Sequence, residues 1–122
     1  MKQILILGSG GFIGTLLRYW VQVFFARQFS ILFPIGTFIV NITGCLAIGL
    51  LYGMANRHNW LSTEWRLFLI TGFCGGYTTF SAFAFEGVSM LKQGHWMPFL
   101  LYTLLSVMVG LLATMVGYAL TK

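Results

Sequence analysis

Charged side chains are scarce in this chain of 122 residues. Only 7% of the residues are charged, with seven Lys and Arg against two Asp and Glu. A soluble domain carries about 25% charged residues, which keep its surface in water. So few charges cannot cover a chain in which 58% of the residues are hydrophobic. The composition therefore excludes a soluble globular domain and a disordered tail.

Cysteine is also rare, with two residues in the whole chain. Cys45 and Cys74 both lie in apolar stretches, so we interpret them as free, buried thiols rather than a disulfide scaffold. The net charge is +5, but the basic residues occur singly, without a run or a stripe. Nucleic-acid binding needs a clustered basic surface, so this class of partner is excluded as well.

Long apolar segments make up most of the chain. A helix needs about 20 apolar residues to cross a bilayer, and helices satisfy their backbone polar groups internally, as lipid demands. The chain has room for four such segments and little else. We therefore predict an all-α integral membrane protein with a single membrane domain over residues 1–122. The predicted transmembrane helices cover residues 4–26, 34–55, 67–91 and 97–120.

Four crossings place both termini and the loop between the second and third helices on one side of the membrane. The basic residues outside the predicted helices are Lys2, Arg57, Arg66 and Lys122 on that side, and Arg27 and Lys92 on the other. This is a weak bias under the positive-inside rule. A chain with so little bias is expected to insert in both orientations, which permits an antiparallel homodimer. The expected location is the inner (plasma) membrane.

Polar residues inside the predicted helices are informative, because lipid makes them costly unless they have a partner or a wet cavity. Arg18 either snorkels to the interface or faces an aqueous vestibule that attracts anions. Asn41 either joins two helices or donates an N–H to a permeating anion. Tyr102 and Ser106 are four residues apart and form a polar stripe, which interhelical hydrogen bonds would also explain.

The third predicted helix contains an unusual stretch, GFCGGYTTFSAF, at residues 72–83. Two adjacent glycines and two threonines make a poor helix interior, so we expect a break near Gly75–Thr79. A broken helix is tolerated in a membrane only where it is buried in protein or lines a cavity. The freed carbonyls and the hydroxyls are hard oxygen ligands suited to a small cation. An unbroken, glycine-rich packing face is the alternative for this spacing.

Aromatic and polar side chains follow the expected break. Phe80 and Phe83 are three residues apart and share one helical face, which Glu86 continues. The edge of an aromatic ring carries partial positive charge, so it can contact an anion without a formal charge. Ser81 adds a hydroxyl at the break. A phenylalanine stripe that faces lipid or core is the simpler interpretation.

Taken in order, three stretches resemble the Fluc (CrcB) family of fluoride channels. They are GFIGTLLRY at residues 11–19, GTFIVNITGC at residues 36–45 and GFCGGYTTFSAFAFE at residues 72–86. The resemblance covers the whole chain, including its length and four helices, and the third stretch is highly specific. One position departs from the family pattern. Ala82 stands where the family commonly has threonine, and the missing hydroxyl bears on the conduction rate.

The resemblance implies a fluoride-selective channel that exports fluoride passively through two pores of an antiparallel, dual-topology homodimer. It implies a structural sodium ion at the dimer interface, held by the backbone carbonyls of Gly75 and Thr78 of each subunit. It also implies roles for eight side chains. Asn41, Phe80, Phe83, Ser81, Tyr102 and Ser106 would line the fluoride pore, and Glu86 and Arg18 would lie at a pore end or vestibule.

Two other functions fit a small four-helix membrane protein. A proton-coupled multidrug antiporter needs a carboxylate within the membrane, for which Glu86 is the candidate. A non-transporting assembly subunit would pack through its glycine faces, which leaves Asn41 and the Gly-Gly-x-Thr-Thr stretch without a role. An enzyme is disfavoured, because no His, Cys or carboxylate cluster has the spacing of a metal or catalytic site.

Overall fold

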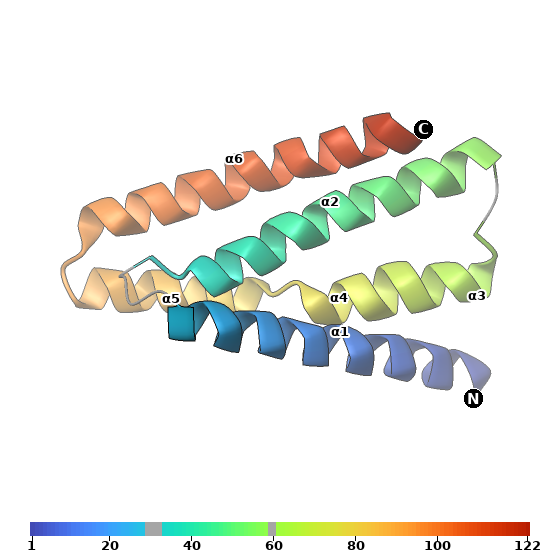
Figure 1. The fold of residues 1–122 in the computed structure, drawn as a ribbon, viewed down its shortest axis with the longest axis horizontal. Coiled ribbons are helices and arrows are strands. Elements are labelled where there is room, and N and C mark those ends of the chain that lie inside the picture. Colours follow the sequence, from blue (N-terminus) through green and yellow to red (C-terminus); the bar gives the residue numbers. More distant parts are fainter. Residues whose placement is uncertain (29–32, 59–60) are drawn as a thin grey trace.

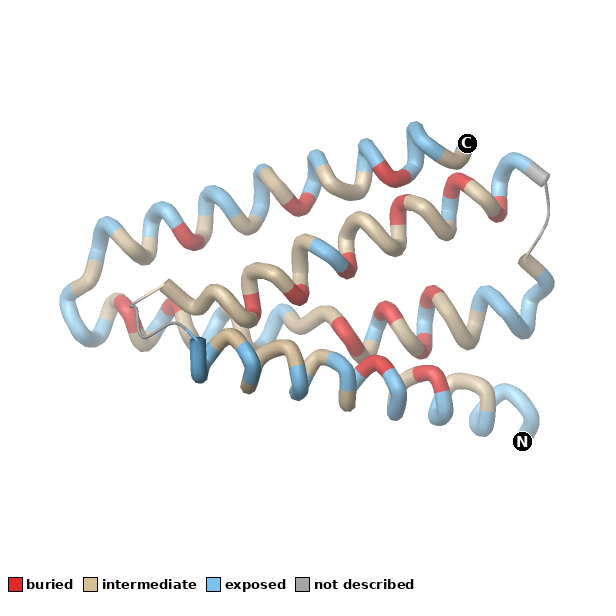
Figure 2. Tube along the Cα trace, in the orientation of Figure 1, coloured by how far each residue is buried: buried red, intermediate tan, exposed pale blue. Residues whose placement is uncertain are grey.

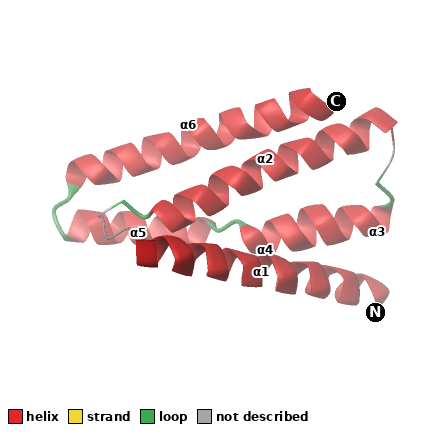
Figure 3. Cartoon of the chain, in the orientation of Figure 1, coloured by secondary structure: helices red, strands yellow, loops and turns green. Residues whose placement is uncertain are grey.

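The computed structural model describes residues 1–28, 33–58 and 61–122, and every regular element in this part of the chain is helical (Figure 3). Four helical segments are long and apolar enough to cross a membrane, which confirms the predicted all-α membrane fold. The first, second and fourth crossings begin and end within a few residues of their predicted bounds. They are α1 (Lys2–Gln28), α2 (Ile35–His58) and α6 (Trp96–Thr121).

The third crossing is built from several pieces. In chain order these are α3 (Thr63–Arg66), the π-helix η1 (Leu67–Cys74), α4 (Gly75–Tyr77) and α5 (Phe80–Lys92). Between α4 and α5, Thr78 is extended with φ −82° and ψ 158°, and Thr79 with φ −150° and ψ 118°. The predicted break is thus confirmed, and it is confined to the two threonines.

The glycine pair before the break remains helical, although its low helix propensity led us to expect an interruption there. Gly76 serves close packing, since a Cβ on this residue would lie 2.7 Å from the carbonyl oxygen of Gly11 on α1. The chain leaves the helix only at Thr78 and Thr79. Threonine is β-branched, and such residues favour the extended conformation seen there.

The crossings form two packed pairs. One pair is α2 with α6, and the other is α1 with η1 and α4. Both termini, the C-terminal end of α2 and the helix α3 lie at one end of the molecule, whereas the α5–α6 turn lies at the other (Figure 1). We call these the terminal end and the turn end. The arrangement agrees with the predicted even number of crossings.

Close backbone contacts hold each pair together toward the terminal end. Gly14 of α1 is buried against η1, where an added Cβ would collide with the carbonyl oxygen of Phe73. On α6, a Cβ at Gly117 would lie 2.5 Å from the carbonyl oxygen of Leu46. Buried positions recur where these helices face one another (Figure 2). Small residues allow this close approach, which supports helix association where lipid supplies no hydrophobic drive.

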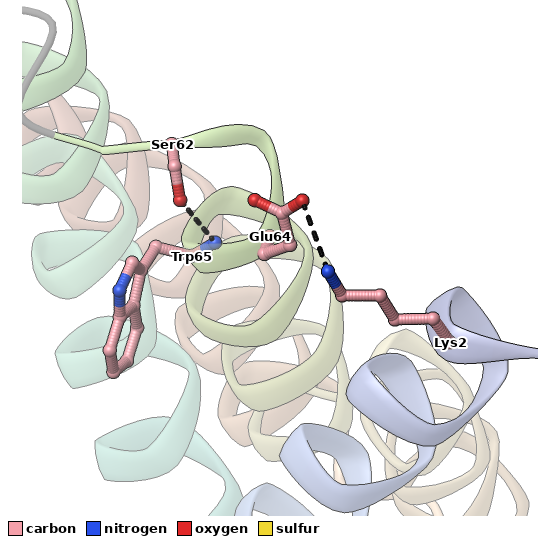
Figure 4. Close-up of polar contacts among 4 residues, drawn as sticks. All are labelled: Lys2, Ser62, Glu64 and Trp65. Atoms are coloured by element: carbon pink, nitrogen blue, oxygen red, sulfur yellow. Dashed lines mark hydrogen bonds and ion pairs between the residues drawn. The ribbon is translucent and has the colours of Figure 1, made fainter.

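A polar cluster joins α1 to the start of the third crossing (Figure 4). The Oγ of Ser62 accepts a hydrogen bond from the Trp65 N–H at 3.3 Å and caps α3. The Nζ of Lys2 lies 3.7 Å from Oε1 of Glu64. Both charged side chains are exposed, so this ion pair is expected to contribute little to stability.

Candidate functional site

Two neighbouring helices supply hydrogen bonds to the backbone around the break. Asn41 on α2 pairs with Thr79 in both directions: its Nδ2 donates to the Thr79 carbonyl oxygen at 3.0 Å, and its Oδ1 accepts from the Thr79 N–H at 2.8 Å. From α1, the Nε of Arg18 donates to the carbonyl oxygen of Gly76 at 3.0 Å. The break is therefore held from both sides by side chains far away in the sequence.

A groove of about 320 Å³ lies beside the break, between α2, α5 and α6. The buried Oγ of Ser106 on α6 has no hydrogen-bond partner in the described part of the chain. A buried hydroxyl without a partner is costly, so it marks a place where water or a solute is expected to bind. Residues that line the groove include Asn41, Thr78, Thr79, Phe80, Phe83 and Ser106.

Three aromatic rings extend from the groove toward the turn end. The ring centroids of Phe80 and Phe83 are 5.7 Å apart and their planes are inclined by 48°. Phe83 lies 5.1 Å from Tyr102, with an inclination of 51°. Phe80 is 78% exposed, so its ring is not a core residue of the single chain. Tilted rings of this kind can direct their positive edges toward one solute path.

A hydrogen-bonded network adjoins these rings and takes one residue from each crossing. Glu86 on α5 accepts from the hydroxyl of Tyr102 at 3.1 Å and from Thr37 Oγ1 at 3.0 Å. Gln22 on α1 donates in turn to Thr37 Oγ1 at 3.0 Å. Tyr102 and Thr37 are almost fully buried. The hydrogen bonds compensate the cost of placing a carboxylate inside the membrane.

The structure brings most of the predicted pore residues together. Asn41, Phe80, Phe83 and Ser106 share the groove. Tyr102 lies next to Phe83 and is bound to Glu86. These residues come from three crossings and form a continuous set that runs from the break toward the turn end.

The other predicted residues lie around the break. Ser81 is exposed, with its Oγ 3.3 Å from Thr79 Oγ1. Arg18 reaches the break from α1 through its hydrogen bond to Gly76 and is not among the described residues that line the groove. Gly75 is exposed, and nothing lies within 4 Å of the position that a Cβ would occupy there. This open backbone surface distinguishes Gly75 from Gly76.

Two members of the site were missed from the sequence. Thr37 and Gln22 complete the Glu86 network, yet neither was selected as a site residue. The signal that could have found them is the one that selected Asn41: a polar side chain inside an otherwise apolar helix. Thr37 also lies within the second stretch on which the family resemblance rests.

The fold and this site define a multi-pass membrane protein with its polar residues gathered inside the bilayer around an interrupted helix. Residues 5–118 match the family model described as "CrcB-like protein, Camphor Resistance (CrcB)". This chain belongs to the CrcB family, as its three sequence stretches indicated.

Curated relatives match the chain along nearly its full length. A protein of Azobacteroides pseudotrichonymphae is 42% identical over 100% of this chain and 98% of its own. One of Chloroflexus aurantiacus is 43% identical over 100% of this chain and 97% of its own. One of Bacteroides fragilis is 45% identical over 96% of this chain and 94% of its own. Each of these relatives is named "Fluoride-specific ion channel FluC".

Proposed function

We propose that this chain is a fluoride-selective channel of the plasma membrane that lets fluoride leave the cell passively. The names of the relatives support this function, and the groove supplies a chemistry that suits it. Fluoride is small, hard and strongly hydrated, so a pore must replace its water with donors. A pore must also bind the ion weakly enough to release it.

The observation that carries the proposal is the unpartnered Ser106 hydroxyl in a groove with two phenylalanine rings and an amide. Ser106 can donate an O–H, and Asn41 retains one N–H beyond the bond to Thr79. The edges of Phe80 and Phe83 add partial positive charge. None of these groups carries a full charge that would trap the ion, so the set favours passage over tight binding.

Tyr102 and Glu86 would form the next part of the path. The Tyr102 hydroxyl lies close to the rings but already donates to Glu86. An anion moving from the groove would therefore meet this pair at the pore end. Arg18, which binds the Gly76 carbonyl just before the break, adds positive charge inside the membrane that raises the local anion concentration.

A structural sodium ion fits the backbone at the break. In a continuous helix the Thr79 N–H would donate to Gly75, but here it donates to Asn41. The Ala82 N–H would likewise serve Thr78, but it donates to Thr79 Oγ1. The carbonyls of Gly75 and Thr78 are thus among those that lose their helical donors at the break. Hard carbonyl oxygens suit sodium, which would supply a fixed positive charge between two subunits.

An antiparallel homodimer would complete the site. Gly75 is exposed near the middle of the third crossing, where its freed carbonyl cannot remain in contact with lipid. Thr71 and Thr15 are also exposed within the crossings. A second copy would cover this surface, and two copies would give two pores. The weak charge bias between the two ends permits the opposite orientations.

The test is anion efflux from liposomes that contain the purified protein, with fluoride and chloride electrodes side by side. Fluoride release without chloride release is expected. Release of both ions would contradict selectivity. If neither ion leaves and a proton gradient drives uptake of organic cations instead, the antiporter function built on Glu86 replaces the channel.

A further inference from the structure

The break interrupts the hydrogen bonds that a continuous helix would give its own backbone. Inside a membrane, each backbone N–H and C=O without a partner costs several kcal/mol, so a break persists only if neighbouring groups satisfy it. Thr78 and Thr79 have both left the helix. Their own segment supplies part of this, since the Thr78 N–H donates to Cys74 and Thr79 Oγ1 accepts from the Ala82 N–H. The backbone N–H and C=O of Thr79 need partners from another helix.

Asn41 forms hydrogen bonds with both backbone groups of Thr79. Its amide accepts from the N–H at 2.8 Å and donates to the C=O at 3.0 Å, as the backbone of a neighbouring β-strand would. The pairing also fixes which end of the amide is oxygen and which is nitrogen, because only one orientation gives both bonds. One N–H of the amide is left over, so its direction is fixed by Thr79.

Arg18 acts on the other side of the break. Its Nε donates to the Gly76 carbonyl oxygen at 3.0 Å, within the last turn before Thr78. Hydrogen bonds from a charged donor are roughly twice as strong as neutral ones. Arg18 lies on α1 and Asn41 on α2. Side chains from two helices therefore bind the backbone just before and just after Thr78.

We infer that Asn41 and Arg18 are positioning residues that hold the break open by taking the backbone groups of Thr79 and Gly76. Neither side chain hydrogen-bonds the carbonyl oxygen of Gly75 or Thr78. This role goes beyond contact with a permeating ion, because all three hydrogen bonds lie within the chain. A test on the backbone can therefore fail while the channel function stands, and the reverse also holds.

The decisive readout is hydrogen exchange of single backbone amides, followed by NMR in detergent micelles. Asn41→Ala removes the acceptor of the Thr79 N–H and is expected to speed its exchange about tenfold. Asn41→Asp keeps an oxygen in the same place, so Thr79 is expected to stay protected. The Thr78 N–H donates to Cys74 at 3.0 Å and serves as the control amide, unchanged in both variants.

Fluoride efflux separates positioning from ion contact. Asn41→Asp keeps the backbone bond but places a carboxyl group beside the path, so efflux is expected to fall although Thr79 remains protected. If Asn41 only contacts the ion, Asn41→Ala will leave Thr79 protected, which would overturn the inference. Should that variant fail to fold, the wild type decides alone: free exchange of Thr79 there would contradict the hydrogen bond.

The role of Arg18 is tested by the NMR signal of its hydrogen-bond acceptor, the Gly76 carbonyl. The ¹³C resonance of the Gly76 carbonyl reports on its hydrogen bond, and the Gly75 carbonyl is the control. Arg18→Met is expected to shift Gly76 and leave Gly75 in place, whereas Arg18→Lys, which retains a charged donor, is expected to recover most of the shift. An unchanged Gly76 resonance in Arg18→Met would exclude Arg18 from this role.

Discussion

The two ends of the molecule are held together by different means. Toward the terminal end, helices meet backbone to backbone, as at Gly14 against η1 and at Gly117 against α2. Toward the turn end, one close backbone contact joins Gly36 of α2 to Gln22 of α1, but side chains make further contacts, including the rings of Phe83 and Tyr102 and the carboxylate of Glu86. The break lies between the two regions (Figure 1).

We infer from this difference that the two regions of the chain have different roles. Close backbone packing fixes the helices against one another in the terminal half, between the terminal end and the break, so we expect this half to be the rigid part. Side-chain contacts leave a groove and an unpartnered hydroxyl, so the turn half can exchange partners with a passing ion. The comparison predicts that substitutions in the terminal half damage folding, whereas many in the turn half damage transport alone.

The largest effect is expected for Gly117→Val in the terminal half. A Cβ there would lie 2.5 Å from the Leu46 carbonyl oxygen and 2.8 Å from the Leu50 nitrogen, so two backbones would have to separate. Size-exclusion chromatography in detergent is expected to show loss of the folded species. Gly8→Val is the matched control, because nothing lies within 4 Å of its Cβ position. A folded, monodisperse Gly117→Val would refute tight packing here.

Thr37→Val is expected to have the next largest effect. It removes the hydroxyl that Glu86 and Gln22 share while keeping the side-chain shape. Leaving buried polar groups without partners costs about 1–3 kcal/mol, which thermal unfolding in detergent will register as a lower midpoint. Thr103→Val on α6 is the control. Equal midpoints for the two variants would mean that the network does not stabilise the turn half.

The fold could be predicted well from the sequence, because long apolar segments leave few alternatives in a membrane. Asn41, Phe80, Phe83 and Ser106 share one groove. Their grouping was predicted only from the family resemblance, which placed all four along a pore. The π-helix η1 was not predicted, and neither was the contact between Arg18 and Gly76. The contact between Arg18 and Gly76 depends on how α1 packs against the third crossing, which no local pattern in the sequence encodes.

Ser106→Ala separates transport from stability. The hydroxyl has no partner in the described chain, so its removal is expected to leave the unfolding midpoint unchanged or slightly raised. Fluoride efflux is expected to fall about tenfold, because a donor to the ion is lost. If the midpoint instead drops sharply while efflux persists, Ser106 is a structural residue and the groove is not the path.

Ala82→Thr is expected to have the smallest effect. Ala82 is half-buried in the first turn of α5, and its N–H donates to Thr79 Oγ1 at 3.2 Å. Restoring the family's hydroxyl is expected to raise fluoride efflux by less than tenfold without changing the unfolding midpoint. Ala84→Thr, on an exposed position of the same helix, is the control. No change in efflux would mean that Ala82 does not limit conduction.

The most direct test of the account compares two phenylalanines of α5 in the same fluoride efflux measurement. Phe80 and Phe85 are 78% and 72% exposed, but of the two only Phe80 is among the residues that line the groove. Phe80→Ile is expected to abolish fluoride efflux, and Phe85→Ile to leave it near the wild-type rate. Equal efflux from the two variants would contradict the claim that ring edges in the groove conduct the ion.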